Sequence, residues 1–292
     1  MIHLENKMPS PSEHTSSWFM DETWCQLTTD QEPWIGPLGA VMCNASIKGL
    51  GALITPPWSL HTEWSGEKNA ALRMALENEN KPVIVIDLPL NHSCNWKAPW
   101  IVQESHTRII KWDAGAPASA HDQWPKHRLK QVRKGSAKGI VIEGCNDVDE
   151  MMALHQMARE RKSIPSDAGA LRKLLQHIIQ SPHQSSLIAR DSEGNPIANA
   201  VILHNKSRSI YAFGGQKRSA LSALATVMLL HRAIEISAEI GQTSFDFGGS
   251  RDPGVDRFYA EFGAIKAKKY RAILCRAPYK WWLRIMRPDL LS

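Results

Sequence analysis

The chain of 292 residues is long enough for one large domain or for two domains of moderate size. Hydrophobic residues make up 43% of it and charged residues 22%, which is the composition of a globular protein with a substantial core. The net charge of +6 is unevenly divided. Residues 1–125 carry 8 Lys and Arg against 14 Asp and Glu, whereas residues 126–292 carry 27 against 15. This division predicts an anionic partner for the second half, although attraction between the two halves is the alternative explanation.

Cysteine spacing and apolar runs limit the class of protein further. The five cysteines are scattered, without a CxxC pair, which argues against a disulfide framework and a zinc site and favours a reducing compartment. The first residues, MIHLENKMPSPSEH, lack the apolar centre of a signal peptide, and no apolar run reaches about 18 residues. We therefore expect a cytoplasmic protein without a metal.

The first half predicts the order β-β-α-β. Residues 1–15 are polar and are expected to be frayed, and Ser16 and Ser17 can cap a short helix, WFMDETWCQL. Two strands follow, PLGAVMCNAS and LGALITPP, and then an amphipathic helix from Ser65 to Lys81. PVIVIDLPL reads as a buried strand and SHTRIIKW as another strand. The small residues from Asp113 to Pro125 predict a linker.

The second half predicts helices around a strand meander. Asp147 and Asp167 are expected to cap two helices, and residues 184–215 read as three antiparallel strands. A long helix is expected from Leu221 to Ile240, with Gly241 ending it, followed by the strand TSFDFGG and a helix from about Gly254 to Phe262.

This order resembles the GNAT acyltransferase fold, and the motif FDFGGS…GVDRFYAEFGA is similar to that of its FemAB-like branch. TPPWSLHTEW, KHRLKQVRKG and IYAFGG fit the same branch. The resemblance implies an α/β fold, a mixed sheet with helices, built as tandem GNAT-like lobes. We expect a first lobe over residues 16–118, a second over 119–276, and a basic aromatic tail over 277–292.

In a GNAT-like fold, two neighbouring parallel strands splay apart and the donor's amide arm enters between them as an extra strand. The strands here are expected to be Ser209–Gly214 and Thr243–Gly249, with Gly248 and Gly249 letting the second strand bend away. The loop before the long helix implies a site for acyl-coenzyme A as co-substrate. Its expected residues are Phe213, Gly214, Gln216, Lys217, Arg218 and Ser219. A solvated basic turn is the alternative, because Ser219 and Ala220, and no glycine, follow Arg218.

The resemblance also implies catalytic and acceptor residues. Asp246 is the first candidate for the base or the acceptor's ammonium site, Tyr259 for proton return to the leaving group, and Tyr211 is the reserve. Each of them could instead be a half-buried structural group. The expected acceptor-binding residues are Trp58, His61, Arg128, Arg133, Arg251 and Phe258.

Two basic tracts suggest partners. Lys126, Lys130, Arg133 and Lys134 fall on one helical face, which could receive an anionic acceptor or be only a solvated face. The C-terminal tract carries Trp281 and Trp282 among cations, a composition that suits binding to an anionic membrane surface. The alternative is that the tract packs back on the domain.

The predicted activity is transfer of an acyl group from a thioester to an amine or hydroxyl of an acceptor, such as a glycan or peptide precursor of the cell envelope. Transfer from aminoacyl-tRNA is the alternative. It is weakened because Tyr259 and Ala260 follow Phe258 where tRNA-dependent members typically carry a lysine, and because no long charged heptad insertion occurs. A binding module without catalysis is the third possibility.

Overall fold

The computed structural model describes residues 17–64, 69–90, 92, 94–113, 124–161, 167–249 and 252–290. The chain divides into two compact units, which differ from the expected lobes. Unit 1 is formed mainly by Arg108–Ile265, and unit 2 by Ser17–Thr107 together with Lys266–Ser292. The segment 266–276, expected in the second lobe, therefore packs with the first part of the chain.

Within the described residues, unit 2 is a sheet with three α-helices and three 3₁₀ turns, formed by the first part of the chain and the C-terminal segment. Its strands are β1 (Pro33–Ile35), β2 (Val41–Ile47), β3 (Leu50–Ile54), β4 (Val83–Asp87), most of β5 (Ile101–Lys111) and most of β11 (Ile265–Cys275). The helices of the first part are α1 (Glu22–Thr29) and α2 (Ala70–Asn78), with 3₁₀ turns at Trp18–Met20 and Pro37–Gly39, and α9 (Tyr279–Met286) and the turn Pro288–Leu290 end the chain. β3 and β4 run parallel, and β11 pairs antiparallel with β4.

Most predicted elements of unit 2 are present with shifted bounds, although β5 is longer than the predicted strand and β1 was not predicted. Ser17 caps the turn before α1 by accepting a hydrogen bond from the Phe19 amide, and Asp21 caps α1 itself. The expected caps Ser16 and Ser65 lie outside the described residues. The sequence analysis missed β11, because its first half carries exposed lysines, while its second half, Ala272–Cys275, is buried beside β4.

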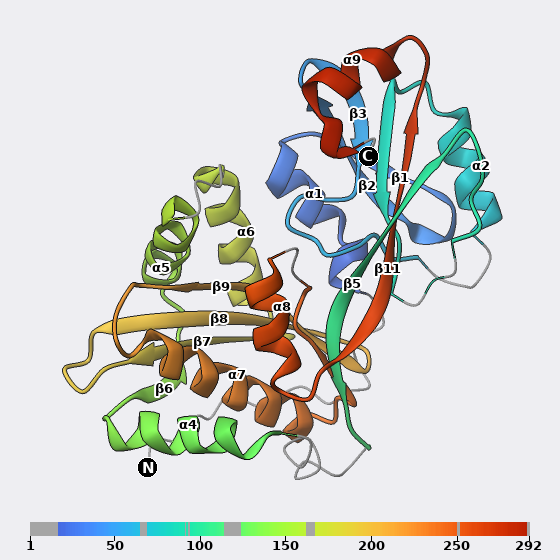
Figure 1. The fold of residues 1–292 in the computed structure, drawn as a ribbon. Helices are drawn as coiled ribbons and strands as arrows, with labels where there is room; N and C mark the ends of the chain where they lie inside the picture. Colours follow the sequence, from blue (N-terminus) through green and yellow to red (C-terminus); the bar gives the residue numbers. More distant parts are fainter. Residues whose placement is uncertain are drawn as a thin grey trace. The chain divides into compact units, whose positions relative to one another are not determined.

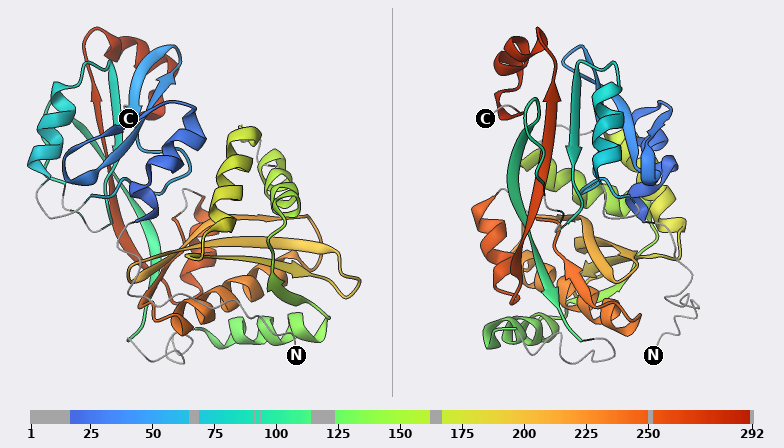
Figure 2. Two further views of the ribbon diagram at one scale, coloured as in Figure 1. Left: turned by 180° about the vertical axis from the view of Figure 1, so that it is seen from behind. Right: turned by 90° about the vertical axis from the view of Figure 1, so that its right-hand side faces the viewer.

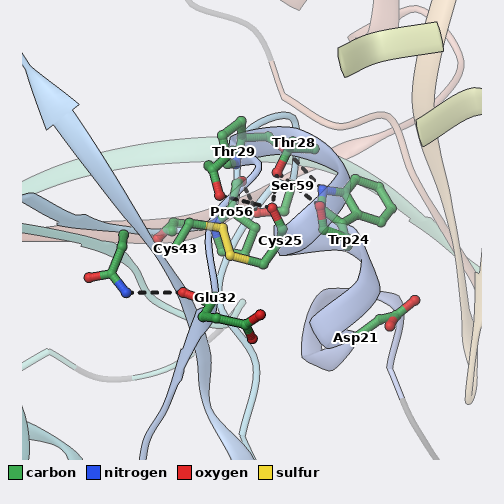
Figure 3. The surroundings of a disulfide bond; sticks show 12 residues. Asp21, Trp24, Cys25, Thr28, Thr29, Glu32, Cys43, Pro56 and Ser59 are labelled. Carbon is green, nitrogen blue, oxygen red and sulfur yellow. Dashed lines mark hydrogen bonds between the residues drawn. A yellow bond between two sulfur atoms is a disulfide. The ribbon is translucent and has the colours of Figure 1, made fainter. Parts of the chain in front are cut away.

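A disulfide joins Cys25 on α1 to Cys43 on β2 (Figure 3). The cysteine spacing had argued against disulfide bonding, so this expectation is wrong for one pair. Both cysteines are fully buried in a small cluster with Val41, where α1 packs on β2. The two cysteines are 18 residues apart in the sequence, and only the packing of α1 on β2 brings them together. Their spacing in the sequence therefore does not predict the bond. Cys94, Cys145 and Cys275 are free.

Unit 1 contains the sheet that holds the predicted site. Its strand order is β5, β10 (Ser244–Asp246), β9 (Arg208–Gln216), β8 (Pro196–Asn205), β7 (Gln184–Arg190) and β6 (Val141–Gly144). Its helices are α4 (Lys126–Ala137), α5 (Val148–Arg161), α6 (Ala168–Gln180), α7 (Ser222–Glu239) and α8 (Pro253–Ala260). Figures 1 and 2 show α4 and α7 over one face of β6–β9, and α5 and α6 over the other face.

The predicted order of unit 1 is confirmed from α5 to α8, including the meander β7–β8–β9, whereas the short strand β6 was not predicted. Asp167 caps α6 by accepting from the Ala170 amide, and Asp147 accepts from the first amides of α5. Gly241 follows α7 with φ of 82°, as expected of the residue that ends a helix. The core between the sheet and α7 contains Ala225, Leu229 and Ile234. The mixed α/β fold class is therefore confirmed.

No helix within the described ranges is both long and apolar enough to cross a membrane.

Candidate active site

The predicted gap between two strands lies in unit 1, between β9 and β10. The strands run parallel and pair over only three positions, ending where Asp246 lies opposite Ile210. The next amide, that of Phe247, donates to the carbonyl of Arg108 on β5, 2.9 Å away, so β10 follows β5. β9 continues to Gln216, and within the described residues its register with β10 has already ended. The main-chain edge of β9 from Tyr211 onward is thus no longer paired with β10.

The double glycine makes this divergence possible. Gly248 and Gly249 have φ values of 80° and 73°, in the left-handed region that side chains with a Cβ rarely adopt. The Gly248 amide donates to the Asp246 carboxylate at 2.9 Å, which stabilises the bend directly after the strand. This contact explains both features of the motif: the acid holds the turn, and the glycines allow it.

A bulge in β9 separates the side chains that follow. The register with β8 passes from Tyr211 opposite Ile202 to Phe213 opposite Val201, which leaves Ala212 as an extra residue. Tyr211 packs against the core on the side of α7 and α8, whereas the Phe213 ring contacts His155 on α5, 6.2 Å between centroids. At this point along β9, one face of the strand therefore carries the Tyr211 phenol, and the other face lies beside the His155 imidazole.

Asp246, Tyr211 and Tyr259 are brought together. Asp246 and Tyr259 are buried, and the Tyr259 ring stacks on Phe247 at 4.9 Å. Burial raises the pKa of Tyr259 well above its ordinary value, and the negative charge of Asp246 raises it further. Burial also raises the pKa of Tyr211, to about 12. Both phenols therefore stay protonated at neutral pH, as a proton donor must.

Two arginines hold α8, and with it Tyr259, in place. Arg108 on β5 makes two hydrogen bonds to the Asp256 carboxylate, of 2.8 and 2.6 Å. Arg128 on α4 pairs with Glu261 at the end of α8 and lies over the rings of Phe258 and Phe262, with 4.5 and 4.8 Å to the ring centroids. The sequence analysis missed Arg108, since its partner is 148 residues away.

Arg128 and Phe258 had been expected to bind the acceptor. Arg128 is 3% exposed and its guanidinium is occupied by Glu261, Gln131 and the carbonyl of Phe258. The structure thus places these two residues in the packing that supports α8. Arg133 on the same helix is exposed, as are Lys126, Lys130, Lys134 and Lys138, so the predicted basic face is present. Arg251 lies outside the described residues.

The predicted donor loop is held by its own hydrogen bonds. The Ser219 amide donates to the Ser222 hydroxyl, which donates to the carbonyl of Lys217, and Thr226 donates to the Gln216 side chain. Lys217 approaches Asp191 at 3.9 Å, and Arg218 is exposed. The loop therefore presents two cations beside the start of α7, where a helix N-terminus favours an anion.

Gly215 fixes how closely α5 approaches β9. A Cβ on Gly215 would lie 2.4 Å from the backbone carbon and oxygen of Leu154. The next residue, His155, is a candidate that the sequence analysis missed, because nothing in its context marks it. Neither ring nitrogen has a hydrogen-bond partner among the described residues, although the Gly214 backbone is close. Burial, and then the charge of Arg159, lowers the pKa of His155, which keeps the ring neutral at neutral pH.

Trp58 and His61 belong to unit 2. His61 is 1% exposed, its Nε2 lies 2.7 Å from the Glu63 carboxylate, and its ring packs edge-on against Phe19. Trp58 is partly buried with φ of 60°, and the nearby Trp64 is buried against the His92 ring. A role of Trp58 and His61 in acceptor binding stays a prediction.

Comparison with known proteins agrees with this geometry. Residues 126–260 match the family model of the acetyltransferase (GNAT) domain, so this part of the chain is an acyltransferase domain of the GNAT type. No curated protein matches the sequence.

Three solved structures share the fold over nearly the whole chain. FemX aligns with a TM-score of 0.61 and 11% identity, covering 89% of this chain and 93% of its own. L-PGS from Bacillus licheniformis aligns with 0.61 and 10%, covering 92% and 91%. The C-terminal domain of a protein named as a lysylphosphatidylglycerol synthetase, from Agrobacterium fabrum, aligns with 0.61 and 11%, covering 94% and 93%. The predicted resemblance to the FemAB-like branch, with two lobes in one chain, is confirmed at the level of the fold.

Proposed function

We propose that the protein transfers an acyl group from acyl-coenzyme A to an amine or hydroxyl of an anionic acceptor. The observation that carries the proposal is the early divergence of β10 from β9, which leaves the edge of β9 beyond Ile210 for the donor's amide arm. Lys217 and Arg218, next to the N-terminus of α7, are suited to the donor's phosphates.

The chemistry is direct transfer. The acceptor's nitrogen or oxygen loses its proton and attacks the thioester carbonyl, forming a tetrahedral oxyanion. The carbon–sulfur bond then breaks, and the leaving thiolate takes a proton from Tyr259. Asp246 is our first candidate for the base that takes the acceptor's proton, and His155 is the second, since it lies on the other face of β9. No covalent intermediate on the protein is required.

The acceptor is the least defined part of the proposal. One protein of the same fold is named for making lysylphosphatidylglycerol, a lipid, which supports an acceptor from the cell envelope. The four exposed cations of α4, together with Lys138 directly after it, support an anionic acceptor. They equally support tRNA, so transfer from aminoacyl-tRNA is the second candidate function.

Calorimetry with acetyl-coenzyme A tests the donor. We expect saturable binding, and binding that remains undetectable at millimolar ligand would overturn the proposal. The triple variant K130Q/R133Q/K134Q should bind acetyl-coenzyme A as the natural protein does, because these side chains lie on α4 and away from the strand gap. If aminoacyl-tRNA is the donor instead, the same variant should bind tRNA more weakly, with a shallower salt dependence.

Two variants separate an enzyme from a binding module. Asp246→Asn and His155→Gln should both still bind acetyl-coenzyme A. If Asp246 is the base, Asp246→Asn should abolish transfer and His155→Gln should not, and the reverse result would make His155 the base. If both variants and the natural protein bind the donor without releasing coenzyme A to any acceptor, the binding module is supported.

A further inference from the structure

The C-terminal helix α9 presents two kinds of side chain on its outer face. Its inner side is fixed to unit 2 by Leu283, which is fully buried, and by Tyr279 and Trp282, in a cluster with Val85 and Ile273. On the outer side, Trp281 is 72% exposed and Ile285 is 60% exposed. These two residues are four positions apart, so they form one apolar stripe along the helix.

A stripe of cations runs beside the apolar one. Lys280 and Arg284 are exposed, are also four residues apart, and form no ion pair with any other residue that the structure describes. α9 contains no acid, and the acid that follows it, Asp289, is bound by Arg287 through two hydrogen bonds of 2.9 Å. The outer face of α9 is thus apolar and positively charged at once.

From this arrangement we infer that α9 docks on an anionic phospholipid surface. Trp and aliphatic side chains on an amphipathic helix enter the interface of a bilayer, and each nearby Lys or Arg adds attraction to anionic lipid. Eight residues of helix measure about 12 Å, so α9 lies along the surface and cannot span it.

A second copy of the chain fits this face less well. In a twofold dimer the same face meets itself, so the unpaired Lys280 and Arg284 of the two copies would meet. Like charges brought together in an interface cost free energy. Anionic headgroups instead supply the missing negative charge.

Sedimentation of the full chain with lipid vesicles tests the inference. We expect binding to vesicles of phosphatidylcholine mixed with an equal amount of phosphatidylglycerol, and little binding to phosphatidylcholine alone. W281A/I285A should reduce the partition coefficient at least about tenfold. K280Q/R284Q should reduce it roughly 30-fold on the mixed vesicles, and its residual binding should no longer depend on salt.

Met74 supplies a matched control, because it is 55% exposed on α2 of the same unit. M74A should bind as the natural protein does, and all variants should keep the thermal midpoint, since the substituted side chains are exposed. The inference is overturned if the natural protein does not bind the mixed vesicles, or if M74A loses as much binding as W281A/I285A. It is also overturned if light scattering shows a dimer that W281A/I285A dissociates.

Discussion

Tyr259 is the proposed donor of the proton to the leaving thiolate. Its ring stacks on Phe247, and burial together with the negative charge of Asp246 keeps its hydroxyl protonated. Tyr259→Phe retains the stacked ring and removes the hydroxyl that would donate the proton. We expect kcat and kcat/KM to fall together by about 100-fold, since general acid catalysis is worth that much, while the thermal midpoint stays the same. Release of coenzyme A thiol measures the rate, and an unchanged kcat would remove Tyr259 from the mechanism.

Arg128 is predicted to matter for stability more than for binding. Its substitution by Met removes the hydrogen bonds to Glu261, Gln131 and the Phe258 carbonyl, and the contact with the Phe258 ring. We expect Arg128→Met to lower the free energy of unfolding by about 1–3 kcal/mol in urea titrations, because the lost hydrogen bonds and ring contact belong to a buried side chain, whereas Glu261 is partly exposed and can be solvated. Arg133→Met, on the exposed face of the same helix, should change it by less than about 0.5 kcal/mol. Equal losses in the two variants would contradict the structural role of Arg128.

At the scale of elements, the contact between α5 and β9 is the most constrained. Gly215→Ala would place a Cβ 2.4 Å from the Leu154 backbone, and neither backbone segment can move cheaply. We expect a loss of several kcal/mol of stability, or failure to fold, as overpacking typically costs about 1–3 kcal/mol even between side chains. Gly144→Ala, on strand β6 with nothing within 4 Å of the added carbon, is the control and should be nearly neutral. Thermal midpoints of the two variants decide the comparison.

The elements also show what a sequence can predict. The order of strands and helices in unit 1 followed from caps, glycines and periodicity, which are local signals. The disulfide and the pairing of Arg108 with Asp256 were not predictable, because each joins segments that meet only in the folded chain. Arg128 was misjudged for a related reason: within a run of cations, nothing local distinguishes the one that turns inward.

At the scale of the whole molecule, the described part of the chain crosses between the units near Thr107 and near Ile265. Unit 1 is therefore an insertion in unit 2, and the C-terminal segment completes the sheet of the first part of the chain. This connectivity explains why a boundary placed in the small-residue segment 113–125 was displaced: the chain changes unit within strand β5, where no turn residue marks the crossing.

The division into two units also predicts which backbone amides a bound donor protects from hydrogen exchange. If acetyl-coenzyme A enters beside β9, hydrogen exchange should slow in residues 211–219 and at the start of α7, because their amides are covered or bonded by the ligand. Exchange in β2, β3 and β4 of unit 2 should be unchanged, which makes these strands an internal control. Protection confined to unit 2, or spread evenly over the chain, would place the donor elsewhere. Protection confined to residues 211–219 and the start of α7 would show that the donor binds where β9 and β10 separate. A binding constant alone does not locate the site.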